Sequence, residues 1–229
     1  MPPSPVAPSH VHPSALVAPL TGVILAGGRA TRFGGSPKGL AMVGSARILD
    51  RVAGALAEVT AGLLMIAHAS DADRWLPGVA VAGDLYPRCG ALGGLHAALV
   101  HAAVARAGTD VLVVAWDMPF VTASLLRTLI QARHDAAADA VLPVHPDGHD
   151  EPLCALYAAR CAAVAERLLQ RGERRAGALA DAVGARRVPP SDLAPLGDPR
   201  TLLLSVNAPA DLAHAHALIA VPHPEHGRS

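Results

Sequence analysis

Cationic side chains and glycines are concentrated in one stretch near the start of the chain. The stretch contains Arg29, Arg32 and Lys38, with glycines before and between them. Glycine permits a positive backbone φ and lets an anion approach the backbone amides closely. The cations add long donors, and the apolar residues 23–26 that precede them predict a buried strand. A strand followed by a glycine-rich basic loop is typical of a site that binds phosphate groups.

The loop does not fit two familiar phosphate-binding motifs. A Walker A loop ends in Gly-Lys-Ser/Thr, but Lys38 stands between a proline and a glycine. The dinucleotide fingerprint needs separated glycines, but Gly27 and Gly28 are adjacent. The pattern at 25–38, Leu-Ala-Gly-Gly-x-x-x-Arg-x-Gly-x-x-x-Lys, resembles the signature of nucleotidyltransferases that use a nucleoside triphosphate and release pyrophosphate. The alternative is a surface turn with ordinary solvated charges.

Asp117 comes shortly after the apolar run 111–115, which is the clearest strand pattern in the chain. Ligands of parallel sheets lie at the carboxyl ends of the strands. A carboxylate there, beside a triphosphate, would suit Mg²⁺, which prefers oxygen ligands and bridges phosphates. A helix N-cap is the alternative role, although Thr122 and Ser124 are better placed for it. The sequence therefore favours the metal role.

Asp84 follows the shorter apolar run 79–82. Its carboxylate could accept two hydrogen bonds from a guanine edge, or it could cap the next turn, which is the more ordinary role. The segment at 90–95, Gly-Ala-Leu-Gly-Gly-Leu, opens an alanine-rich helix. Its glycines could admit an anion to the free amides of the helix start, or they could serve tight packing of the helix on the sheet.

The elements that must position these side chains alternate along the chain. Apolar runs predict strands at 23–26, 63–67, 79–82, 111–115, 140–144, 153–157 and 202–206. Spacing and composition predict helices at 48–59, from the 90–95 segment to about 107, at 158–171 and at 209–220. Pro209 suits the first position of the last helix. This alternation predicts an α/β fold with a largely parallel sheet.

Composition bounds the protein as a whole. The 229 residues suit one domain, and the formal net charge of zero argues against a general nucleic-acid binder. No run is long and apolar enough to make a membrane a partner. The three cysteines are widely spread, which favours reduced thiols in a cytoplasmic protein. We expect one domain at 19–220 between disordered tails at 1–18 and 221–229.

Several segments, in one order, resemble the molybdenum cofactor guanylyltransferase family, MobA, from residue 21 to about residue 220. They are the 25–38 motif, Asp84, the glycines of 90–94, Trp-Asp-Met-Pro-Phe-Val at 116–121, His-Asp-Glu-Pro at 149–152, Gly-Glu-Arg-Arg at 172–175 and Ser-Val-Asn-Ala-Pro-Ala-Asp-Leu at 205–212. The first motif fixes only the nucleotidyltransferase class, whereas the last two point to this family. The resemblance implies a single three-layer Rossmann-like nucleotidyltransferase domain with a mainly parallel mixed sheet.

The resemblance also implies roles for the matching residues. On the nucleotide it places Leu25, Ala26, Gly27, Gly28, Lys38, Asp84 and Asp117. Lys38 would bind the phosphates, Asp84 the guanine side, and Asp117 the Mg²⁺ and GTP. On the catalytic or molybdopterin side it places Arg32, Gly90, Gly94, Arg175 and Asn207. Arg32, Lys38 and Asp117 are the residues expected to be catalytic.

Three positions depart from the family pattern. Trp116 replaces a small residue before the aspartate. Ser205 stands where the family often has asparagine, which weakens the expected contacts to the pterin. The base-proximal asparagine of the family is missing around residues 66–68, which leaves the strictness of guanine selection open.

The implied reaction is transfer of GMP from GTP to the terminal phosphate of Mo-molybdopterin, with Mg²⁺ as cofactor and pyrophosphate as the second product. Transient contacts with molybdenum cofactor synthesis proteins and apo-molybdoenzymes are further expectations. One alternative is a related nucleotidyltransferase that uses CTP or another phosphorylated acceptor. Another is a non-catalytic nucleotide-binding accessory protein, against which the intact Arg32, Lys38 and Asp117 argue.

Overall fold

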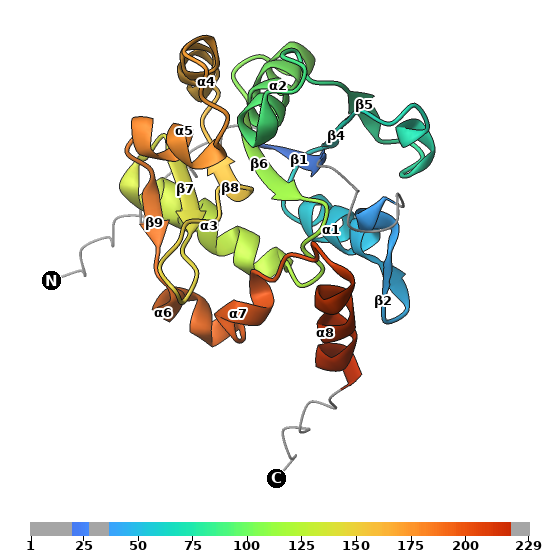
Figure 1. Ribbon diagram of the computed structural model, residues 1–229. Helices are drawn as coiled ribbons and strands as arrows, with labels where there is room; N and C mark the ends of the chain where they lie inside the picture. The colour runs from blue at the N-terminus through green and yellow to red at the C-terminus, as the bar shows by residue number, and fades with distance from the viewer. Residues whose placement is uncertain (1–19, 28–36, 221–229) are drawn as a thin grey trace, which may run out of the picture.

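The computed structural model describes residues 20–27 and 37–220. Its main sheet has seven strands in the order β5-β4-β1-β6-β8-β7-β9 (Figure 1). The strands are β1 (Leu20–Ala26), β4 (Leu63–Ala67), β5 (Ala80–Ala82), β6 (Asp110–Ala115), β7 (Ala140–Pro143), β8 (Cys154–Tyr157) and β9 (Arg186–Val188). Only β8 runs antiparallel to its neighbours β6 and β7, whereas the remaining neighbours pair in parallel. The predicted α/β class with a mainly parallel mixed sheet is confirmed.

Helices cover both faces of this sheet (Figure 1). On one face lie α1 (Ile48–Ala57), α3 (Ala123–Ala136), α6 (Pro190–Leu193), α7 (Pro199–Leu202) and α8 (Pro209–Ala220). On the other face lie α2 (Gly90–Ala105), α4 (Cys161–Gln170) and α5 (Ala176–Ala182). Because successive side chains of a strand point to opposite faces, Ile24 joins the first apolar core while Val23 and Leu25 join the second. The three-layer prediction is confirmed.

Three short 3₁₀ turns and a small second sheet complete the described part of the chain. The turns are η2 (Lys38–Leu40), η3 (Ala72–Arg74) and η4 (Ala194–Leu196), and the two-stranded sheet pairs β2 (Met42–Val43) with β3 (Ala46–Arg47). Thr122 is the N-cap of α3, since its Oγ1 accepts a hydrogen bond of 3.2 Å from the amide of Leu125. The sequence preferred Thr122 and Ser124 over Asp117 for this role, and Asp117 is accordingly left for the site.

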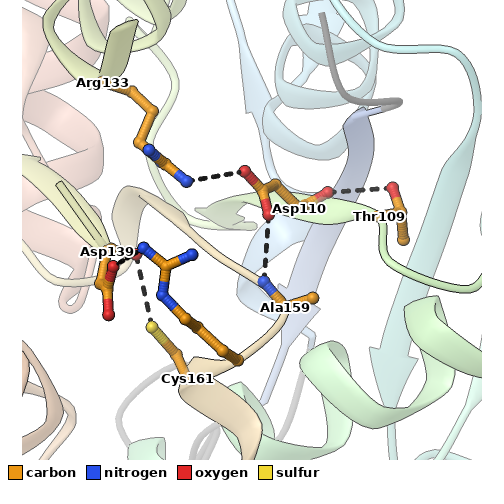
Figure 2. Close-up of polar contacts among 7 residues, drawn as sticks. Thr109, Asp110, Arg133, Asp139, Ala159 and Cys161 are labelled. Carbon is orange, nitrogen blue, oxygen red and sulfur yellow. Dashed lines mark hydrogen bonds and ion pairs between the residues drawn. The ribbon is translucent and has the colours of Figure 1, made fainter. Parts of the chain in front are cut away.

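A polar network anchors the amino end of β6, at the opposite end of the strand from Asp117 (Figure 2). The Asp110 carboxylate accepts hydrogen bonds from the Arg133 guanidinium at 3.2 Å and from the Ala159 amide at 3.1 Å. Nearby, the Cys161 thiol donates to the backbone oxygen of Asp139 at 3.3 Å. The two Asp110 contacts connect β6 to α3 and to the segment between β8 and α4. They therefore fix the position of the strand that precedes Asp117.

One predicted strand is wrong, and one strand of the main sheet was not predicted. The apolar run 202–206 is not a strand, because α7 ends at Leu202 and residues 203–206 have no regular structure. Leu202, Leu203 and Val206 are apolar because they are buried in the core under the helices. Conversely, β9 was missed, since Arg186 and Arg187 are exposed and charged and give no apolar strand pattern.

The predicted tails at 1–18 and 221–229 lie outside the described residues, so the expected domain boundaries stay predictions. Within 20–27 and 37–220, no helix has the length and apolar character needed to cross a bilayer.

Candidate active site

The ammonium group of Lys38 joins two other predicted site residues in one cluster. Its Nζ forms an ion pair with Oδ2 of Asp117 and donates a hydrogen bond of 2.8 Å to Oδ1 of Asn207. Lys38 begins η2, Asp117 follows β6, and Asn207 precedes α8. Three segments that are far apart in sequence therefore meet at a single cation. Asn207 was predicted on the molybdopterin side, and it lies beside the residue expected to bind phosphates.

Asp117 is held in place by its backbone as well as by Lys38. Its carbonyl oxygen accepts a hydrogen bond of 2.8 Å from the amide of Val206. The residue is buried, and burial raises the pKa of its carboxyl above the usual range, while Lys38 opposes part of that rise. A carboxylate in this environment needs a cation beside it, and in the structure that cation is the Lys38 ammonium.

Trp116, which departs from the family pattern, supports the turn that carries Lys38. A Cβ atom added to Gly39 would lie 2.4 Å from Cε3 of Trp116, so the indole packs directly on the backbone of this turn. The ring also stacks on Trp75, with centroids 5.1 Å apart and planes inclined by 20°. The large side chain is therefore accommodated by a glycine on one side and a second indole on the other.

Asp84 lies at the carboxyl end of β5, in the same edge of the sheet as the ends of β1, β4 and β6. Its Oδ2 is 2.9 Å from Nε2 of His68, the residue that directly follows β4. A Cβ atom on Gly94 would lie 3.6 Å from Asp84 Oδ1 and 3.8 Å from Cδ2 of Leu25. The carboxylate thus faces the start of α2 and the end of β1.

Gly90 and the Gly-Glu-Arg-Arg segment meet at the start of α2. Gly90 has φ +65°, and an added Cβ would lie 2.9 Å from the carbonyl oxygen of Arg174. That oxygen also accepts a hydrogen bond of 3.1 Å from the amide of Leu92. Arg175 is exposed, and its guanidinium pairs with Glu173 at 2.9 Å. Hydrogen bonds from the Arg175 guanidinium and from the backbone amides of Arg175 and Arg174 lower the pKa of Glu173 to about 2. The structure therefore groups Gly90 with this segment.

The structure brings several of the predicted residues together. Lys38, Asp117 and Asn207 are in contact, and Gly94 lies close to both Asp84 and Leu25. Ala26 is buried at the end of β1, and Gly27 is exposed after it. Gly28 and Arg32 lie outside the described residues.

Two residues near these groups were not predicted. His68 was noted only as part of the region that lacks the family asparagine, yet it pairs with Asp84. The signal for His68 was available, since it is a polar residue directly after a predicted strand of a parallel sheet. Glu151 raises the pKa of Asp117 through space, a coupling that sequence spacing does not reveal.

A surface groove of about 420 Å³ lies elsewhere, between α3, β9 and α6. None of the predicted site residues lines it, and it is bordered by side chains such as Thr128, Asp135, Arg186 and Asp192. It offers no grouping of the kind seen around Lys38, so the edge of the sheet is the better candidate.

Comparison with known proteins shows which family the chain resembles. Residues 22–186 match the family model for the MobA-like NTP transferase domain. A probable molybdenum cofactor guanylyltransferase of Pelotomaculum thermopropionicum is 35% identical over 198 residues, covering 86% of this chain and 92% of the relative. A molybdenum cofactor guanylyltransferase of Desulfosudis oleivorans is 31% identical over 201 residues, covering 87% of this chain and 96% of the relative.

A solved structure of similar fold is molybdopterin-guanine dinucleotide biosynthesis protein A from Archaeoglobus fulgidus. It superposes with a TM-score of 0.72 at 25% identity, covering 87% of this chain and 98% of that protein. The family predicted from the sequence motifs is confirmed: the chain belongs to the MobA-like NTP transferase family.

Proposed function

We propose that the protein transfers GMP from GTP to the terminal phosphate of Mo-molybdopterin, giving molybdopterin guanine dinucleotide and pyrophosphate. The observation that carries this proposal is the contact of Lys38 with Asp117 and Asn207 at the carboxyl edge of the sheet. The names of relatives that match most of the chain supply the substrates.

The chemistry asks the protein for position and charge. The acceptor is a phosphate monoester with a second pKa of about 6, so it is mostly dianionic at neutral pH and needs no general base. One of its oxygens attacks the α-phosphorus of GTP, and the bond to the bridging oxygen of the β-phosphate breaks. Both reactants are anions, so the main barrier is electrostatic repulsion. Lys38 would offset it by donating hydrogen bonds to phosphate oxygens, aided by Arg32.

Asp117 would hold Mg²⁺ through its carboxylate. The fit rests on chemistry seen in the structure: a buried carboxylate oxygen is a ligand that Mg²⁺ prefers, and its charge already has a cation beside it. When bound, Mg²⁺ would polarise the phosphoryl oxygens and neutralise charge on the leaving pyrophosphate. Asn207 would keep Lys38 oriented when Asp117 turns to the metal.

Base selection would belong to Asp84. Guanine presents N1–H and N2–H₂ side by side, and one carboxylate can accept from both, whereas adenine and cytosine present acceptors there. Leu25, Ala26, Gly27 and Gly28 would contact the nucleotide from the end of β1. Gly90, Gly94 and Arg175 would lie toward the molybdopterin. We further propose a cytoplasmic location and transient contacts with molybdenum cofactor synthesis proteins and apo-molybdoenzymes.

Release of pyrophosphate tests the proposal, measured with Mo-molybdopterin and with GTP or CTP, with and without Mg²⁺. We expect release that requires GTP, the acceptor and Mg²⁺ together. A preference for CTP, or turnover with another phosphorylated acceptor, would identify a sister transferase. Nucleotide binding without any release would identify an accessory protein, and either outcome would overturn the proposal.

A further inference from the structure

The hairpin that joins β7 to β8 carries three metal-binding side chains at its tip, namely His145, Asp147 and His149. One possible ligand atom from each lies within 4.8 Å of the other two. The imidazole rings of His145 and His149 have centroids 4.9 Å apart, and Nδ1 of His149 is 2.9 Å from Oδ1 of Asp147. Two imidazoles and a carboxylate therefore converge on one small volume.

The backbone of the hairpin holds these groups together. The amide of Gly148 donates to the carbonyl oxygen of His145 at 2.8 Å, and the amide of His145 donates to the carbonyl oxygen of His149 at 2.8 Å. Pro146 restricts its own φ, and Gly148 takes φ +96°. This is a three-residue hairpin loop in which a tight turn is followed by a glycine bulge. The approach of the two histidines is thus set by the turn.

Glu151 supplies an independent sign of a metal-binding arrangement. Its Oε2 lies 3.3 Å from Nε2 of His145, and its Oε1 accepts a hydrogen bond of 3.2 Å from the amide of Leu153. Both side chains of the His145–Glu151 pair are largely buried. Metal-ligating histidines usually donate their second ring N–H to a carboxylate, which fixes the ring and the tautomer. If Nε2–H donates to Glu151, Nδ1 of His145 keeps a free lone pair.

We propose that His145, Asp147 and His149 bind a divalent transition metal ion, with Zn²⁺ as the best match, and that Glu151 orients His145. Imidazole nitrogens suit Zn²⁺ and its neighbours, whereas Mg²⁺ prefers oxygen ligands. Three protein ligands leave a fourth tetrahedral position for water or an anion. The site is separate from the carboxylate proposed to hold Mg²⁺ at Asp117, and the inference does not depend on the proposed function.

Calorimetric titration of Zn²⁺ into the metal-stripped full-length chain tests the site. Histidines 10, 12, 223 and 226 lie outside the described residues, so glutamine replaces them in every protein compared. His149→Ala should bind one equivalent fewer than this parent. His134→Ala, which removes an exposed histidine of α3, is the matched control and should bind as the parent does. Glu151→Gln should keep the equivalent and bind it about 10 to 100 times more weakly.

Cobalt gives a spectroscopic readout of the same site, since Co²⁺ in a tetrahedral site with nitrogen ligands absorbs visible light strongly. The parent should show this absorption, and His149→Ala should lack it. Asp147→Asn is a conservative change at an exposed position and should also weaken Zn²⁺ binding. It keeps the test valid if the His149→Ala variant does not fold. If His149→Ala and Asp147→Asn both bind Zn²⁺ with the parent's stoichiometry and affinity, the proposal is wrong.

Discussion

For single residues, the charges of Asp117 and Lys38 are the central feature of the site. Burial disfavours the charged form of Asp117 and raises its pKa, and Lys38 opposes part of that rise. The Asp117 carboxylate and the Lys38 ammonium form an ion pair, so a change in either group affects the other. Binding of a triphosphate and a metal would exchange this internal ion pair for two external ones: Lys38 with phosphate, and Asp117 with the cation.

Asp117→Asn should abolish Mg²⁺-dependent pyrophosphate release while the protein stays folded. The amide has nearly the same shape but carries no charge to hold the metal. Turnover measured against Mg²⁺ concentration, with circular dichroism as a check of folding, tests this. Asp192→Asn, an exposed aspartate of α6, is the control and should leave turnover unchanged. Activity near the wild-type level in Asp117→Asn would remove the metal assignment.

Lys38→Ala should weaken GTP binding by about ten- to a hundredfold. A hydrogen bond from a charged donor contributes roughly 1.5–3 kcal/mol, and each 1.4 kcal/mol is about a factor of ten in affinity. Calorimetry with GTP measures the change. Equal GTP affinity in both proteins, together with slower transfer, would confine the role of Lys38 to the transition state.

Asp84→Asn should reduce the preference for GTP more than it reduces the binding shared by all triphosphates. Mismatched buried polar groups cost about 1–3 kcal/mol, and the amide cannot accept from two guanine donors at once. Competition of GTP against ATP and CTP gives the selectivity ratios for both proteins. Unchanged ratios would mean that guanine is selected elsewhere, with the backbone of the β1 turn as the first candidate.

At the scale of elements, the position of Lys38 depends on how closely η2 packs on the residue after β6. Gly39 is buried, and the indole of Trp116 occupies the space where any larger residue would place its Cβ. The stack of Trp75 on the other face keeps the indole from moving aside. A glycine and two tryptophans thus set the distance between the end of β6 and Lys38.

Gly39→Ala should lower both thermal stability and GTP affinity. The methyl group would overlap the Trp116 ring, and overpacking of this kind costs typically about 1–3 kcal/mol. Gly54→Ala in α1 is the control, because a Cβ there meets nothing within 4 Å. It should be neutral or stabilising, since alanine favours helix over glycine. A Gly39→Ala protein as stable and as tight in binding as wild type would contradict the packing argument.

At the scale of the whole molecule, the site depends on two apolar cores that clamp one sheet. Side chains of β1 and β6 alternate between the cores, so neither strand can shift by one residue without exchanging its buried faces. The carboxyl ends of β1, β4, β5 and β6 are therefore fixed relative to one another. The site residues that follow these strands are therefore positioned by the sheet as well as by their contacts with each other.

Leu112→Ala should destabilise the protein by about 2–5 kcal/mol, because Leu112 is fully buried in the middle of β6. Base selectivity of the folded fraction should stay unchanged, since the residue does not contact the site. Thermal unfolding and nucleotide competition measure the two effects. Leu85→Ala is the exposed control, and its stability should stay near that of wild type. A change in base selectivity would show that the core and the site are coupled more closely than the sheet suggests.

The fold class and most of the strands could be predicted from the sequence, because a buried parallel strand needs an apolar run wherever it occurs. The sequence also placed Asp84 and Asp117 correctly after their strands. The prediction failed where a residue can be buried without pairing in the sheet, or can pair without being buried. Residues 202–206 are apolar because they enter the core beneath the helices, although they form no strand. In contrast, β9 pairs through its backbone while its two arginines are exposed.

The structure was needed to show which of these residues meet. Lys38, Asp117 and Asn207 are separated by long stretches of chain, and no spacing rule links them. His68 meets Asp84 where β4 and β5 end side by side, and Trp116 packs on Gly39 where the end of β6 lies against η2. Local pattern fixes which face of an element is apolar, whereas contacts across the sheet edge depend on strand order and register, which the chain sets only when it folds.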